Sequence, residues 1–237
     1  MNAPHEPASR RTALAIVFAL VAAAFAIALL AADRPRLRRP AAPDGARRAA
    51  FAVRDVVPPF QQWGTRAFTL PTLRSAYEHV DYLTLPDHED AGKSAFLARL
   101  GPLLDANEHV DLFVLAHTNT CVEWVETLAA SRRERLRLVY NTGCFDLAER
   151  EQWLRLGADA YVGHVGLSAS SVFYVAFLRG WVRGEPLEHL ASEGNAFTHR
   201  MLATIACFGE VDVDRIAAQS RAEISGNASL SVDGGRR

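Results

Sequence analysis

The stretch that decides the fold runs from residue 111 to residue 144 and reads DLFVLAHTNTCVEWVETLAASRRERLRLVYNTGC. It opens with an apolar run that ends at His117 and closes with a second apolar run that ends at Cys144. Between them, apolar residues recur at helical spacing. The 27 positions that separate His117 from Cys144 are about the length of one strand–helix–strand crossover between parallel strands.

The same alternation continues on both sides of this stretch. Short runs typical of strands occur at residues 66–70, 80–85, 111–116, 136–140 and 158–162. Segments with apolar residues at helical spacing lie between or after them, at residues 92–106, 121–131, 147–156 and 170–182. Alternating strands and helices predict an α/β domain with a mostly parallel sheet and helices on both faces.

In open parallel sheets, reactive groups collect at the carboxyl ends of the strands. The first apolar run leads into His117 and the second into Cys144, so we expect an imidazole and a thiol to be neighbours at one edge of the sheet. A free thiol titrates near pH 8.5, and a close imidazole favours the thiolate and supplies a proton to a leaving amine. For Cys144 alone, the alternative is a buried thiol that behaves as a small hydrophobe.

In these features the chain resembles the caspase-like cysteine peptidases, a superfamily that includes metacaspases, gingipains and CHAT-domain proteins. The resemblance covers residues 65–200 and rests on DLFVLAH, LRLVYNTGC and the block LRLGADAYVGHVGLSASSVFYVAFLRGWVRGEPLEHLASEGNA. It implies an endopeptidase that works through an acyl-enzyme, with Cys144 as nucleophile and His117 as base. The backbone N–H of Cys144 and another from the loop after His117 would hold the oxyanion.

Four further residues are candidates for oxyanion or substrate binding. Thr118 stands where the family usually has Gly, and a β-branched residue tolerates positive φ poorly, so an inactive scaffold or sensor of the same fold is the alternative function. Gly143 allows a substrate backbone to approach closely. Asp146 is either a helix N-cap or a receptor for a basic side chain, and His164 is either a polar plug or part of the cleft.

Charge and cysteine content exclude several classes of function. The net charge is −1, but residues 1–54 hold nine Arg against three acidic residues, which leaves −7 for residues 55–237 and argues against nucleic acid as a partner. The three cysteines show no C-x-x-C spacing, and we expect Cys121 and Cys207 to be packed in the core. No phosphate-binding glycine motif occurs, and no spacing fixes three metal ligands, so we expect neither a cofactor nor a metal.

The amino-terminal region is predicted to anchor the chain in a lipid bilayer. Residues 13–32 carry no charge and are long enough for a single transmembrane helix, although a cleaved signal peptide is the alternative. The arginines that follow place the domain in the cytoplasm by the positive-inside rule. Residues 9–14, SRRTAL, partly resemble a twin-arginine export signal, which would place it outside.

The predicted organisation therefore has five parts. A tail covers residues 1–12, the membrane helix 13–32, an Arg- and Pro-rich linker 33–54 and the caspase-like α/β domain 55–207. A second tail covers residues 208–237, with a short helix expected at 214–222. The expected partners are the bilayer and a polypeptide substrate or protein.

Overall fold

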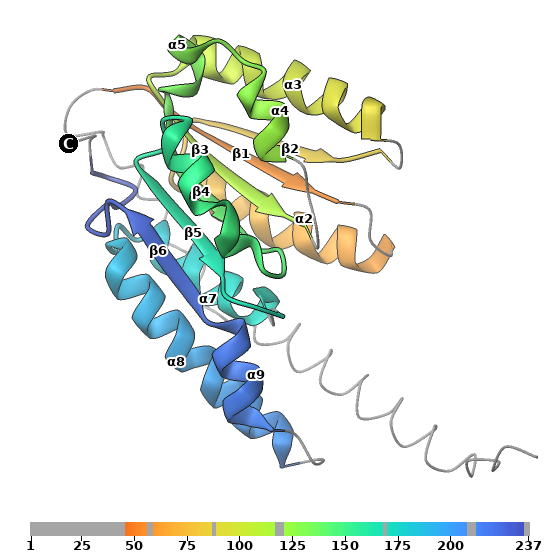
Figure 1. Ribbon diagram of the computed structural model, residues 1–237, viewed down its shortest axis with the longest axis vertical. Helices are drawn as coiled ribbons and strands as arrows, with labels where there is room; N and C mark the ends of the chain where they lie inside the picture. The colour runs from red at the N-terminus through yellow and green to blue at the C-terminus, as the bar shows by residue number, and fades with distance from the viewer. Residues whose placement is uncertain are drawn as a thin grey trace, which may run out of the picture. The chain divides into compact units, whose positions relative to one another are not determined.

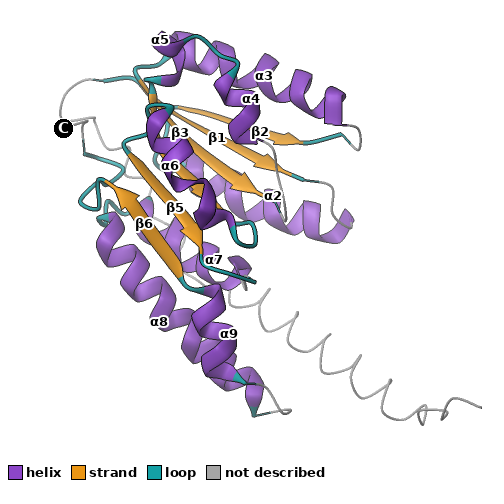
Figure 2. Cartoon of the chain, viewed as in Figure 1, coloured by secondary structure: helices purple, strands orange, loops and turns teal. Residues whose placement is uncertain are grey.

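A six-stranded sheet with the strand order β2-β1-β3-β4-β5-β6 forms the centre of the domain (Figures 1 and 2). The computed structural model describes residues 46–55, 59–86, 89–116, 121–167, 170–207 and 212–234. All of them belong to one unit of the chain, Leu37–Arg237. The first five strands in sequence pair in parallel, and the last pairs antiparallel to β5. The prediction of an α/β fold with a mostly parallel sheet is confirmed.

The middle of the sheet is apolar on both faces, as expected for parallel strands that helices cover on both sides. In β3 and β4 almost every residue is buried, and the two edge strands are more exposed. The strands are β1 (Arg48–Arg54), β2 (His79–Thr84), β3 (His109–Leu115), β4 (Leu136–Asn141), β5 (Ala160–His164) and β6 (Ala222–Gly226).

Alternate residues of each strand point to two separate hydrophobic clusters. Phe51 and Leu112 pack with the helices of one face, and Ala50 and Phe113 pack with those of the other. The first face carries α3 (Glu89–Ala106), α4 (Cys121–Glu126), α5 (Ala130–Arg133) and the 3-10 helix η1 (Asp146–Glu149) with α6 (Arg150–Arg155). The second carries α2 (Pro59–Arg74), α7 (Ser170–Trp181) and α8 (Leu187–Ala206), while α9 (Val213–Ser220) packs against α8.

Three predicted segments differ from the structure. Residues 66–70 are not a strand but part of α2, where the buried residues Thr69, Thr72 and Leu73 follow helical spacing. The predicted linker, 33–54, contains β1, which lies between β2 and β3 in the sheet. The predicted tail, 208–237, contains β6 as well as α9, so the expected short helix at 214–222 ends earlier and a strand follows it.

The two arginines at the ends of β1 explain why it resembled a linker. The guanidinium group of Arg48 donates to the carbonyl of Val232 at 2.6 Å, and that of Arg54 donates to the carbonyl of Leu115 at 2.6 Å. Both charges therefore cap backbone carbonyls of neighbouring segments while the apolar residues between them lie in the core. A short apolar run flanked by arginines looks like part of a basic linker until its partners are known.

A buried polar network joins the amino-terminal end of the sheet to the carboxyl-terminal segment. Arg137 on β4 pairs with Asp111 on β3 at 2.5 Å, and both side chains are fully buried. The Tyr77 hydroxyl donates to Asp111 and accepts from the indole N–H of Trp181 at 2.7 Å. Arg137 also donates to the Gly234 carbonyl at 2.6 Å, so the end of the described chain is anchored.

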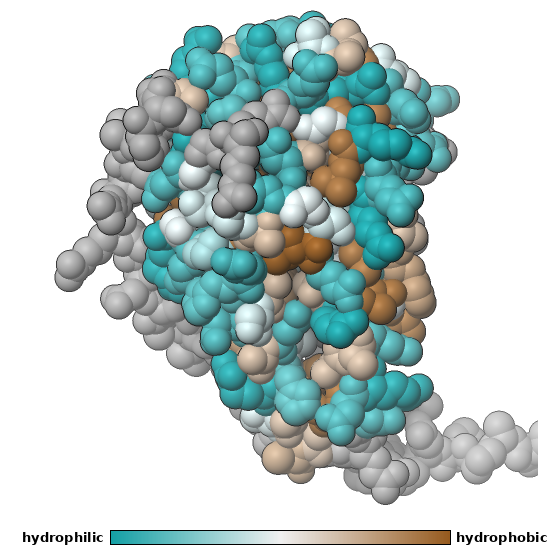
Figure 3. Space-filling model, turned by 60° about the vertical axis from the view of Figure 1, so that its left-hand side comes forward, coloured by the Kyte–Doolittle hydropathy of each residue, from teal (hydrophilic) through white to brown (hydrophobic). Residues whose placement is uncertain are grey.

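The surface of the face drawn in Figure 3 is mostly hydrophilic, with apolar side chains gathered in a few small areas. Within the described ranges, no helix has both the length and the apolar character needed to cross a bilayer. The predicted membrane helix, residues 13–32, lies outside those ranges, as do the preceding tail and most of the predicted linker.

Candidate active site

The carboxyl ends of β3 and β4 bring the two candidate catalytic segments together. The backbone N–H of Thr142 donates to the Val114 carbonyl at 2.9 Å, and the Thr142 hydroxyl reaches the Ala116 carbonyl at 3.5 Å. Ala116 directly precedes His117 in the sequence, and Thr142 stands two residues before Cys144. His117 and Thr118 themselves lie outside the described residues.

Cys144 is half-buried in a turn directly after β4. The next residue, Phe145, has a φ of 60° and is the one non-glycine residue with positive φ in the described part of the chain. For a residue with a β-carbon this conformation costs about 1–2 kcal/mol. The turn therefore contains a local strain at the position that follows the candidate nucleophile, a place where strain is often functional.

The turn is fixed from inside by Asn141, the last residue of β4. Its side-chain oxygen Oδ1 accepts from the backbone N–H of Gly143 at 3.1 Å, and its side-chain Nδ2 donates to the Glu149 carboxyl at 3.3 Å. The indole N–H of Trp153 also donates to Glu149, at 3.0 Å. Burial raises the pKa of Glu149, and these two hydrogen bonds oppose the rise. Gly143 thus belongs to a hydrogen-bonded turn that presents Cys144.

Asp146 connects this turn to the next strand. Its side chain is only 5% exposed, and Oδ1 accepts from the backbone N–H of His164 at 2.5 Å. The N-cap position is occupied by Phe145, so the prediction that Asp146 caps the following helix is wrong. Because the carboxyl is buried, it is also not available to receive a basic side chain of a substrate.

Burial is also the main influence on the ionisation of Asp146. It raises the pKa of the carboxyl to about 8, against the hydrogen bond from His164, and the nearby Glu149 adds to the rise. Oδ2 makes no hydrogen bond within the described part of the chain. A carboxyl with this pKa is mostly protonated at neutral pH, so Asp146 supports the turn mainly as a neutral group.

His164 is a buried polar plug and does not line an open cleft. It is fully buried, and its Nδ1 lies 2.7 Å from the Ser220 carbonyl, which can only accept. Nδ1 therefore carries the proton, and Nε2 accepts from the Tyr140 hydroxyl at 3.3 Å. Burial lowers the pKa of His164 to about 4, so the imidazole is neutral at physiological pH.

A small residue at position 163 permits this arrangement. A β-carbon on Gly163 would lie 2.6 Å from the Tyr161 ring and 3.1 Å from Oδ1 of Asp146. The Tyr161 hydroxyl occupies that space and donates to the backbone carbonyl of Asp146 at 2.7 Å. The alternation Tyr161, Gly163 along β5 thus leaves room for the turn that holds Cys144.

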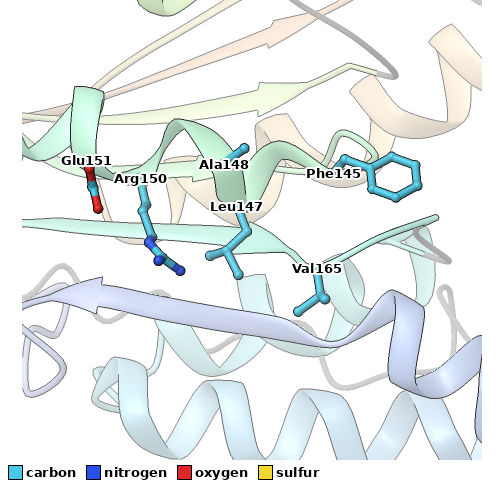
Figure 4. Close-up of a pocket in the computed structure, with 6 residues that line it drawn as sticks. All are labelled: Phe145, Leu147, Ala148, Arg150, Glu151 and Val165. Atoms are coloured by element: carbon cyan, nitrogen blue, oxygen red, sulfur yellow. The ribbon is translucent and has the colours of Figure 1, made fainter.

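An open pocket of about 420 Å³ lies beside the turn (Figure 4). Its apolar lining comes from Phe145, Leu147, Ala148 and Val165, and Arg150 and Glu151 contribute one charge of each sign. In Figure 4 the ring of Phe145 extends outward at one end of the row, and Leu147 and Val165 extend to a common side. The pocket therefore continues the surface around Cys144 with apolar side chains.

The other two cysteines have different surroundings. Cys121 is fully buried, as expected, and burial, with Glu149 and Asp55 nearby, raises the pKa of its thiol. Cys207 is exposed at the end of α8, so its prediction as a core residue is wrong. In the segments that the structure describes, no group of three His, Cys, Asp or Glu side chains is placed to hold a metal ion.

The structure reveals site residues that the sequence analysis did not single out. Asn141, Glu149, Tyr161 and the exposed Phe145 all act on the Cys144 turn. Only Phe145 carries a visible sequence signal, because a large apolar residue stands in a polar loop after a strand. Neither a protein-family model nor a curated protein matches this chain, so the geometry of the turn is what indicates its role.

Proposed function

We propose that the chain is a caspase-like cysteine endopeptidase in which Cys144 is the nucleophile and His117 the general base. The observation that carries the proposal is the contact between Ala116, which directly precedes His117, and Thr142, which stands two residues before Cys144. The mostly parallel sheet is compatible with a caspase-like fold. The half-buried thiol lies in a turn that hydrogen bonds hold from several sides.

The proposed reaction has two stages. The sulfur of Cys144 attacks the carbonyl carbon of a peptide bond, the C–N bond breaks, and the proton held by His117 passes to the leaving amine. Water then attacks the thioester and transfers a proton to His117. A carboxylic acid leaves, and the thiol is restored. Backbone N–H groups near Cys144 would stabilise the negative oxygen that forms in each stage.

Thiol labelling of the full chain tests the proposal with internal references. Iodoacetamide is applied between pH 5 and 9, and the labelled cysteine is identified by mass spectrometry. We expect Cys144 to react faster than the exposed Cys207 at low pH, because a nearby imidazole promotes the thiolate. His117→Ala should remove this advantage, whereas His199→Ala, at an exposed histidine on α8, should retain it.

Two outcomes would overturn the assignment. If Cys144 never reacts faster than Cys207 in the native chain, the thiol is not activated, and the alternative of an inactive scaffold or sensor takes its place. If peptide hydrolysis by the purified chain persists in Cys144→Ala, another group performs the reaction. Cys121 serves as the unreactive reference, because it is buried in the native protein.

We also propose that residues 13–32 anchor the chain in a bilayer with the domain on the cytoplasmic side. The support is the uncharged run itself and the arginines that follow it. The chain should stay with membranes after alkaline carbonate extraction, and removal of residues 1–36 should release it. A membrane-impermeant maleimide should label Cys207 only after the cells are opened. Labelling in intact cells would indicate the exported orientation.

A further inference from the structure

An apolar surface adjoins Cys144 at the carboxyl edge of the sheet. In the described ranges five large hydrophobic side chains are exposed, and three of them, Phe145, Val165 and Leu167, lie in the segments that follow β4 and β5. The N–H of Phe145 donates to the Gly166 carbonyl at 3.1 Å and so joins the two segments. Leu147 lines the pocket beside the Cys144 turn together with Phe145 and Val165. We call the four residues Phe145, Leu147, Val165 and Leu167 the apolar rim.

Phe145 combines an exposed side chain with a strained backbone. The side chain is 59% exposed, and the residue has a left-handed conformation that glycine or asparagine would adopt more easily. Figure 4 shows its ring extending outward at the end of the pocket. A large aromatic group held in solvent at such a cost is the kind of feature that marks a binding surface.

The charges near the rim do not favour a charged ligand. Asp146 is buried against the N–H of His164 and offers no negative surface. The pocket's two exposed charges, Arg150 and Glu151, are adjacent and of opposite sign. Selection at this surface therefore depends on the burial of apolar area.

We propose that the apolar rim binds a large apolar side chain, such as Leu or Phe, of a polypeptide whose backbone passes Cys144. This inference rests on the proposed function and specifies the substrate class of the same site. The apolar rim begins at Phe145, which directly follows the nucleophile. When a peptide bond is held at Cys144, the substrate residues next to that bond would therefore face the rim. The site would then select an apolar residue next to the scissile bond.

Alkylation of Cys144 by amino-acid reagents tests the rim without requiring peptide hydrolysis. The probes are the amides of leucine, phenylalanine, aspartate and arginine, each with an iodoacetyl group on its α-amino nitrogen. They are applied to the full chain at one pH. The rate at Cys144 is divided by the rate at Cys207 in the same sample, which removes differences in reagent reactivity. We expect the Leu and Phe reagents to label Cys144 about tenfold faster than the charged ones, as about 1.4 kcal/mol of binding energy predicts.

Two variants relate the preference to the rim. Phe145→Gly removes the ring but keeps a residue that accepts positive φ, and it should reduce the tenfold preference to less than about threefold. Trp63→Ala is the matched control, because Trp63 is 74% exposed on α2, on the opposite face of the sheet from α6. It should leave the preference unchanged.

The outcomes separate this inference from the proposed function. Equal rates for apolar and charged reagents, or a preference that survives in Phe145→Gly, would overturn the inference about the rim. If the apolar preference is present but plain iodoacetamide shows no activation of Cys144, the rim binds apolar groups and the peptidase proposal fails. Cleavage by the active chain next to Asp or Arg in a peptide mixture would also overturn the apolar selection.

Discussion

Replacement of Asp146 by Asn should change how the stability of the protein depends on pH. In the folded state burial raises the pKa of this carboxyl to about 8, whereas an unfolded chain has the ordinary value of about 3.9. The folded state therefore holds a proton that the unfolded state releases as the pH rises above 4. The stability associated with this group is complete below pH 4 and is lost progressively as the pH rises to 8.

The size of the effect follows from the difference in pKa. Each unit corresponds to about 1.4 kcal/mol, so the wild-type protein should lose about 4 kcal/mol between pH 4 and pH 7 through this group alone. The asparagine side chain of the Asp146→Asn variant cannot ionise, so the variant should not lose this stability. The amide resembles the protonated carboxyl and can still accept from the N–H of His164. A constant cost of about 1–3 kcal/mol is expected from the new N–H groups, since Oδ2 has no partner in the described chain.

Urea unfolding monitored by tryptophan fluorescence at pH 5, 6, 7 and 8 measures the difference in the free energy of unfolding between variant and wild type. This difference should shift in favour of the variant by about 3 kcal/mol from pH 5 to pH 7. His164 has a lowered pKa of about 4, so its stabilising contribution is lost as the pH falls from about 6.5 to 4. Its contribution is common to both proteins and cancels in the difference.

Glu151→Gln is the control, since this side chain is exposed on the neighbouring helix α6 and its replacement should change stability by less than about 0.5 kcal/mol. Parallel stability profiles for wild type and Asp146→Asn between pH 5 and 8 would refute the reasoning. They would mean that the carboxyl is already ionised in the folded protein and that its burial is compensated.

Two further predictions concern the packing that supports the site. Arg137→Met should destabilise the protein by about 3–5 kcal/mol in urea unfolding, because it removes the cation that pairs with the buried Asp111 carboxylate. The double variant Asp111→Leu, Arg137→Met should lose less stability than this single variant. An equal or greater loss in the double variant would contradict the explanation. Gly194→Ala should cost about 1–3 kcal/mol in the same assay, because the new methyl group would lie 2.6 Å from the Phe173 ring. Gly64→Ala, where nothing lies within 4 Å, should be neutral or slightly stabilising, and similar losses in both variants would exclude the steric explanation.

Local pattern was sufficient for the segments whose neighbours in sequence are also their neighbours in space. The runs that became β2, β3, β4 and β5 contain the β-branched, aromatic and leucine residues typical of strands, and the segments that became α3 and α7 have helical spacing. The rule that parallel strands end at a common edge then indicated where polar residues would gather. For this reason the candidate position of Cys144 could be read from the sequence, and the structure describes it after β4 as expected.

The arrangement of the residues around the Cys144 turn depends on hydrogen bonds between distant segments, and local sequence patterns do not indicate such bonds. The carboxyl of Asp146 binds the N–H of His164, 18 residues away, and His164 in turn binds the Ser220 carbonyl, 56 residues away. An aspartate at the start of a helix predicts a cap, and the better partner across the sheet became visible only in the fold. The exposure and strained backbone of Phe145 follow from the same clamped turn.

The sequence by itself thus determined the fold class, the approximate positions of β2, β3, β4 and β5 along the chain and the position of the candidate nucleophile, because hydrophobic periodicity is a property of consecutive residues. Only the tertiary structure decided that Arg48–Arg54 is an inner strand and that Ala222–Gly226 closes the sheet antiparallel to β5. The strands that pair with them lie far away in the chain. Pairing energy that depends on such partners can be counted only when the whole sheet is assembled.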